Sequence, residues 1–171
     1  MTAPTTLTRE RSDLIETLGK HRDFLRYTVR GLTDEQATAR PTASALSLAG
    51  VLKHVANTEA TWQGFIEHGG AAFGGDNWSP EAWQRQWQLE PGETLATVLA
   101  RYEEVGRRTD QLIATLPDLD ADHPLPEAPW FEPGARWSAR RAVVHILAET
   151  AQHAGHADIL RESIDGQKTM G

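Results

Sequence analysis

Residues 138–166 read SARRAVVHILAETAQHAGHADILRESIDG, and the fold is inferred most directly from this stretch. Apolar and small side chains recur at every third or fourth position, as one face of an α-helix requires. Ser138 is a typical N-cap and Gly166 a typical helix end, so the pattern predicts both boundaries. The stripe consists of Val143, Ile146, Leu147, Thr150, Ala154, Ala157, Leu160 and Ile164.

Three further stretches repeat this pattern. Each predicted helix spans about 22–28 residues, or about 33–42 Å at 1.5 Å per residue. Four amphipathic helices of matched length predict an all-α fold, a four-helix bundle, and we expect residues 1–171 to form a single domain. The three stretches run from Leu14 to about Gly31, from an N-cap at Ser47 to Gly69, and from Thr94 to Pro117.

The connections between the predicted helices are long for a bundle and rich in Gly, Pro and Trp. Long connections permit crossovers, so a simple up-and-down order is not required. Ser79 and Pro80 resemble a helix start, which predicts a short helix from there through Trp87. No strand pattern competes with the helical ones. The connections are residues 33–46, 69–93 and 117–137.

The composition is that of an ordinary water-soluble globular chain, with 39% hydrophobic and 24% charged residues. The net charge of −7 disfavours an electrostatic nucleic-acid binder. No apolar stretch approaches the ~20 residues that a membrane span needs, and the N-terminal residues lack a signal-peptide core, so we expect a cytoplasmic protein. The absence of cysteine means that any metal ligands must be His, Asp or Glu.

The fourth helix carries the candidate metal ligands. Glu149 and His153 are four residues apart beside its apolar stripe, so their side chains share one face. His54 lies on the flank of the second helix's stripe, whereas His145 and His156 point farther outward. Two imidazoles and one carboxylate on two packed helices predict a three-ligand site that leaves positions open for water or substrate. The alternative from spacing alone is a set of solvated polar side chains.

Other polar and aromatic residues receive structural interpretations. His21 lies in the stripe of the first helix, and we expect a core histidine with a hydrogen-bond partner in preference to a ligand. Arg161 lies on the inward side of the fourth helix, and we expect it to pair with an acid of a neighbouring helix, the alternative being an anionic substrate group. We expect the loop tryptophans to seal the bundle ends. These are Trp78, Trp83, Trp87, Trp130 and Trp137.

Two segments resemble the DinB-like superfamily: LAGVLKHVANTEATW at 48–62 and HILAETAQHAGHADILRE at 145–162. The resemblance spans essentially the whole chain and implies a four-helix bundle with crossover connections, a homodimer, and a divalent metal between the second and fourth helices. The branch that includes the mycothiol-dependent maleylpyruvate isomerases uses His, Glu and His, which correspond here to His54, Glu149 and His153. His156 stands where many relatives have Gln and is a candidate additional ligand. The isomerases carry a further C-terminal domain, so we do not carry their specific reaction over.

The resemblance implies an enzyme that uses one divalent ion, with zinc expected first and nickel, iron or manganese as alternatives. Such an ion lowers the pKa of a small thiol such as mycothiol and holds it as thiolate for attack on an electrophile. The leading hypothesis is therefore a thiol S-transferase or an isomerase-like enzyme, with a small thiol and an electrophile as its partners. Two alternatives stay open: a hydrolase that activates water, and a non-enzymatic dimeric bundle that binds a small ligand.

Overall fold

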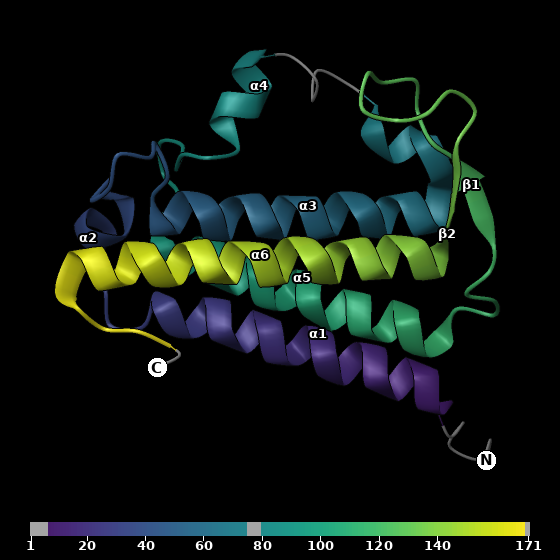
Figure 1. Cartoon of the computed structure of the whole chain (residues 1–171), viewed down its shortest axis with the longest axis horizontal. Helices are drawn as coiled ribbons and strands as arrows, with labels where there is room; N and C mark the ends of the chain where they lie inside the picture. Colours follow the sequence, from purple (N-terminus) through teal and green to yellow (C-terminus); the bar gives the residue numbers. More distant parts are fainter. Residues whose placement is uncertain (1–6, 75–79, 170–171) are drawn as a thin grey trace.

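The computed structural model describes residues 7–74 and 80–169, and the four expected long helices are present within them (Figure 1). The predicted starts are confirmed, because the side chains of Ser47, Thr94 and Ser138 each accept a hydrogen bond from the backbone N–H three residues later. Gly166 ends the last helix in the left-handed conformation, with φ 76°. The helices are α1 (Arg9–Thr28), α3 (Leu48–His68), α5 (Leu95–Thr115) and α6 (Ala139–Asp165).

The helices form a bundle in which α3 packs against α5 and α6, and α1 packs against the same two helices. Figure 1 shows α3 and α5 running in one direction and α1 and α6 in the other. Since α3 and α5 are parallel neighbours, the chain between them returns along the length of the bundle. This crossover explains the long predicted connection, and it contains η1 (Gly69–Phe73) and α4 (Pro80–Arg85). The predicted all-α bundle with a crossover is confirmed.

The first helix ends earlier than its sequence pattern predicts. α1 stops at Thr28, and the guanidinium of Arg161 donates hydrogen bonds to the carbonyl oxygens of Thr28 and Arg30 at 2.7 and 2.9 Å. These carbonyls therefore find partners outside the helix. The following polar cluster begins a short helix, α2 (Asp34–Thr38), with a capping box between Thr33 and Gln36.

Two short strands and the extent of α4 also depart from the sequence reading. β1 (Asp122–Pro124) and β2 (Arg136–Ser138) pair in antiparallel register, with His123 opposite Trp137. The sequence shows no strand pattern here because three residues are too few to form an alternation. The short helix predicted through Trp87 is present as α4 but ends at Arg85. Its expected cap, Ser79, lies outside the described residues.

Two apolar clusters fill the bundle, and polar residues separate them. Along α1, α3 and α5, the buried Arg22, Glu59 and Thr109 lie between residues of the first cluster and residues of the second. Among residues 7–74 and 80–169, no helix has both the length and the apolarity needed to cross a bilayer. The first cluster includes Leu25, Leu52, Tyr102 and Leu160, and the second includes Leu18, Phe65, Ile113 and Ile146.

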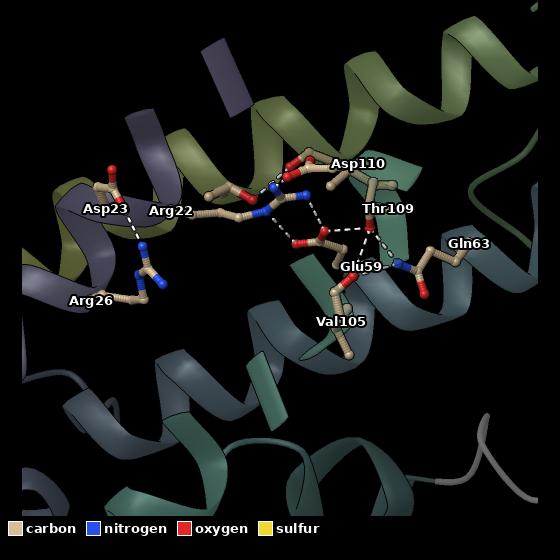
Figure 2. A network of polar contacts seen from close by, with 10 residues as sticks. Arg22, Asp23, Arg26, Glu59, Gln63, Val105, Thr109 and Asp110 are labelled. Atoms are coloured by element: carbon tan, nitrogen blue, oxygen red, sulfur yellow. Dashed lines mark hydrogen bonds and ion pairs between the residues drawn. The ribbon is translucent and has the colours of Figure 1, made fainter. Parts of the chain in front are cut away.

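The buried polar residues form one hydrogen-bonded network (Figure 2). The Arg22 guanidinium contacts both carboxylate oxygens of Glu59, at 2.5 and 3.2 Å, and donates to Asp110 at 2.8 Å. Thr109 donates to Glu59 at 2.5 Å and receives a hydrogen bond from Gln63. Burial alone would lower the pKa of Arg22, but Glu59 and Asp110 raise it above its usual value. The network therefore holds α1, α3 and α5 in register with its charges compensated.

Candidate metal centre

Three side chains from the antiparallel helices α3 and α6 converge on one point. His54 comes from α3, and Glu149 and His153 come from consecutive turns of α6. The Nε2 atoms of His54 and His153 lie 3.8 and 3.5 Å from Oε2 of Glu149, and one candidate ligand atom from each residue lies within 4.8 Å of the others. These three residues are called the trio below. Two imidazole nitrogens and a carboxylate oxygen at this separation form a donor set that suits a divalent cation.

The crossover connection holds the ring of His54. The Trp87 ring stacks on it with centroids 3.8 Å apart and an interplanar angle of 16°. Nδ1 of His54 lies 3.3 Å from the side-chain oxygen of Gln86. An Nδ1–H that donates to this oxygen would leave the Nε2 lone pair available to an ion bound beside Glu149. Gly50 permits this packing, because a Cβ there would overlap the carbonyl oxygen of Trp87.

His153 is held from its other side by His156. The Nδ1 atoms of the two rings lie 3.3 Å apart, so one ring donates and the other accepts. If Nε2 of His153 ligates an ion beside Glu149, its Nδ1–H would donate to the lone pair of His156. Among the described residues, His156 is not in the cluster of candidate ligands, which contains only the trio. Its contact is with the ring of His153 and not with the carboxylate.

Glu149 is the fixed negative charge of the site. Hydrogen bonds donated by the imidazole of His153, followed by that of His54, hold the pKa of Glu149 well below its usual value, although partial burial opposes this. Nε2 of a third histidine, His145, lies 3.8 Å from Oε1 of the same carboxylate. Burial is the main cause that lowers the pKa of His145, against the opposing effect of Glu149. The ionised carboxylate can thus balance half of a divalent charge and leave a net positive centre.

The trio lines a pocket of about 980 Å³, a volume in the range of small-molecule sites. Its walls come from α3, α5 and α6, from the crossover connection and from the segment between β1 and β2. Asn57, one turn after His54, also lines it. The Asn57 side-chain oxygen is buried and has no hydrogen-bond partner among the described residues. This acceptor indicates that a ligand with an N–H or O–H group would complete the site.

The prediction that His21 is a core histidine is wrong. His21 is only partly buried, and its ring packs edge-on against Phe24 with centroids 5.8 Å apart. The neighbouring Arg22 is buried instead, because Glu59 and Asp110 supply its counter-charges. The sequence shows no sign of this, because nothing around Arg22 indicates that a carboxylate from another helix lies inside the bundle.

Arg161 has the structural role that the sequence reading favoured, with a different partner. It pairs at 2.9 Å with Asp165 of its own helix, and not with an acid of a neighbouring helix. Its remaining hydrogen bonds go to the two carbonyls at the end of α1 described above. The guanidinium is buried, and all three of its nitrogen atoms have partners, so Arg161 connects α6 to the end of α1.

The tryptophans of the connections have different surroundings. Trp137 stacks on Trp62 at the C-terminal end of α3, with centroids 4.8 Å apart, and so seals the bundle end as expected. Trp83 and Trp130 are largely exposed and line the pocket, so the expectation is wrong for them. Trp87 packs on His54, and Trp78 lies outside the described residues. The sequence reading did not foresee the contacts of Gln86 and Trp87 with His54, because both residues lie beyond a short helix and follow no periodic pattern.

Fold and site together define a DinB-like bundle with a candidate metal centre between its second and fourth long helices. The chain belongs to the mycothiol S-transferase family, whose model matches residues 13–166. No curated protein matches the sequence significantly. A solved structure of a conserved protein from Enterococcus faecalis has a similar fold, with a TM-score of 0.64 and 14% identity over 91% of this chain and 97% of the other.

Proposed function

We propose that this protein is a divalent-metal-dependent S-transferase that joins a low-molecular-weight thiol, mycothiol or a close analogue, to an electrophile. The observation that carries the proposal is the convergence of two Nε2 atoms and one carboxylate oxygen at the wall of a pocket large enough for two small substrates. Membership of the mycothiol S-transferase family supports the choice of thiol. The chain has no cysteine, so the sulfur must come from a cosubstrate.

The donor set fits a divalent ion, with zinc proposed first because two imidazoles and a carboxylate are common zinc ligands. His54, Glu149 and His153 would hold it, and the ion would supply a Lewis acid that favours the deprotonated form of a thiol. Gln86 and His156 fix the tautomers of the two imidazoles, which keeps both Nε2 lone pairs directed at the ion.

The reaction is a substitution at carbon. The sulfur of the thiol forms a bond to the electrophilic carbon while the bond from that carbon to its leaving group breaks. The leaving group departs with the electron pair, and the thiol proton passes to solvent. The chain's contribution is to orient the two substrates side by side in the pocket, which raises their effective concentration.

The test begins with metal content. We expect about one divalent ion per chain in the wild type purified without a chelator or a histidine tag. The ion should be lost in His54→Ala, Glu149→Gln and His153→Ala. Matched controls are His68→Ala and Glu162→Gln, exposed residues of the same types on α3 and α6, which should retain it. Wild type without bound metal after incubation with zinc would contradict the site.

Activity is then measured with mycothiol and 1-chloro-2,4-dinitrobenzene. The three variants of the trio should lose conjugation, and the two controls should keep it. The same enzyme is assayed without thiol on 4-nitrophenyl acetate to compare hydrolysis. Metal-dependent hydrolysis in the absence of any thiol-dependent reaction would replace the transferase by a hydrolase.

A further inference from the structure

The pocket has two ends of different chemistry. One end is lined by the aromatic residues Trp62, Phe73, Trp130 and Phe131. The other end is lined by the charged residues Lys53, Glu90, Glu93 and Arg101, together with Trp83 of α4. Lys53 and Trp62 are nine residues apart on α3, which corresponds to about 13 Å along the helix axis. In Figure 1, α4 lies beside one half of α3, and the segment before β2 lies beside the other half.

The aromatic end is a continuous series of rings that reaches the trio. His145 is its inner member, with its ring centroid 4.8 Å from that of Trp62 and its Nε2 3.8 Å from Glu149. Trp137 lies 5.2 Å from His145, and Phe131 lies 5.8 Å from Trp137. Trp130, 6.2 Å from Phe131, is the outer member of the series.

Trp130 is 60% exposed although it is a large apolar side chain at the mouth of a pocket. Exposed tryptophans at a concave site commonly bind a ligand, since their rings gain much buried area when covered. The four charged residues that line the pocket beside the trio all belong to the opposite end. The guanidinium of Arg141 lies over the Trp137 ring at 4.7 Å, but Arg141 does not line the pocket. A carboxylate or ammonium group bound among the rings would lose its hydration without gaining an ion-pair partner from the pocket wall, so this end favours an uncharged molecule.

We propose that the aromatic end is the subsite for the electrophile and that it takes an uncharged, planar aromatic molecule. The thiol enters from the charged end, where Lys53, Glu93 and Arg101 surround its polar body, and Asn57 accepts a hydrogen bond from it. The assignment rests on the proposed function and adds the class of its second substrate. With a chloroarene, the sulfur–carbon bond forms as the carbon–chlorine bond breaks. Chloride leaves with the electron pair, and the thiol proton passes to solvent.

Binding is tested first, without any reaction. The probe is 1,3-dinitrobenzene, which lacks a leaving group, and its dissociation constant is measured by calorimetry with wild type and with Trp130→Ala. We expect the Kd to rise about tenfold in Trp130→Ala, because roughly 1.4 kcal/mol of ring contact is lost. Tyr27→Ala, which removes an exposed aromatic residue from α1 outside this pocket, should leave the Kd unchanged. Arg101→Gln at the charged end should also leave it unchanged.

Kinetics then separate this inference from the proposed function. Trp130→Ala and Phe131→Ala should raise the KM for 1-chloro-2,4-dinitrobenzene about tenfold while the KM for mycothiol and the rate with iodoacetamide, a small aliphatic electrophile, stay within twofold. Arg101→Gln should raise the KM for mycothiol instead. If dinitrobenzene binds and Trp130→Ala weakens it while no thiol is transferred, the subsite stands and the proposed function fails. If dinitrobenzene does not bind, or binds both proteins equally, the aromatic subsite is wrong whatever the transferase activity.

Discussion

Arg22 of α1 and Glu59 of α3 form a two-point ion pair inside the bundle, with the carboxylate fully buried and the arginine side chain 7% exposed. The pair lies between two apolar clusters, and Thr109 and Asp110 of α5 complete its hydrogen bonds (Figure 2). A compensated pair of this kind adds little net stability over an apolar pair of the same size. Removing one partner alone should nevertheless lower the free energy of unfolding strongly, because the other charge then stays buried and unpaired. This difference between single and double replacement can be tested.

Glu59→Gln should destabilise the fold by about 3–5 kcal/mol, because it leaves the buried Arg22 without its main counter-charge. Urea unfolding followed by circular dichroism measures the loss. Asp110→Asn is the matched control. Asp110 contacts the same guanidinium but is 37% exposed, so the expected loss is below about 1 kcal/mol. The double variant Arg22→Met with Glu59→Met should recover most of the stability. If Glu59→Gln were as stable as wild type, the buried charge of Arg22 would not need the carboxylate of Glu59 as its partner.

Gly50→Ala should weaken metal binding without touching a candidate ligand. The new methyl group would overlap the carbonyl oxygen of Trp87 and displace the ring that stacks on His54. We expect a loss of about 10-fold or more in zinc affinity, measured by competition with a chromophoric chelator. Gly19→Ala in α1 is the control, because nothing lies within 4 Å of the added Cβ. It should stabilise the helix by about 0.5–1 kcal/mol and leave zinc affinity unchanged.

His156→Leu should reduce zinc affinity by about 10- to 100-fold, because His153 then loses the acceptor for its Nδ1–H. His156→Gln should restore most of this affinity, since an amide side chain also offers an acceptor oxygen. Rescue by Gln separates a hydrogen-bonding role from mere packing. Were Leu and Gln to bind zinc alike, His156 would have no part in orienting His153.

Glu93→Gln should destabilise the protein in a pH-dependent way. Burial alone would raise the pKa of Glu93, but the backbone N–H of Glu90 and the ammonium group of Lys53, 2.6 Å away, outweigh it and lower the pKa. A lowered folded-state pKa contributes stability that is complete above the unfolded value of about 4.3 and is lost as pH falls through the folded pKa. Wild type should therefore exceed the variant by about 2 kcal/mol at pH 7, with the gap closing below about pH 4. Urea unfolding at several pH values tests this. A gap independent of pH would exclude the ionised carboxylate as its cause.

The long helices could be predicted because their signals are local. Apolar spacing gave their faces, and Ser47, Thr94 and Ser138 gave three starts that the hydrogen bonds confirm. The same periodicity brings Glu149 and His153 onto one face of α6, and the packing of α3 against α6 adds His54. Whether the trio holds a metal stays a prediction.

The rest depends on contacts between segments far apart in the chain. The burial of Arg22 requires Glu59, which is 37 residues away. Trp87 reaches His54 only because the crossover returns along the bundle and Gly50 leaves room for it. The three-residue strands β1 and β2 and the five-residue helix α2 are too short to show a periodic apolar pattern. In each case, the decisive partner lies outside the window in which a sequence pattern can be recognised.

The trio stands on two packed helices, whereas much of the pocket wall comes from the crossover and from the segment between β1 and β2. Trp83 and Trp130 belong to neither apolar cluster, so the chain can exchange them at little cost to folding. The candidate metal centre and much of the pocket wall are thus encoded in separate parts of the sequence. A library confined to these wall positions should change which molecules the pocket binds in proteins that still fold and keep the geometry of the trio.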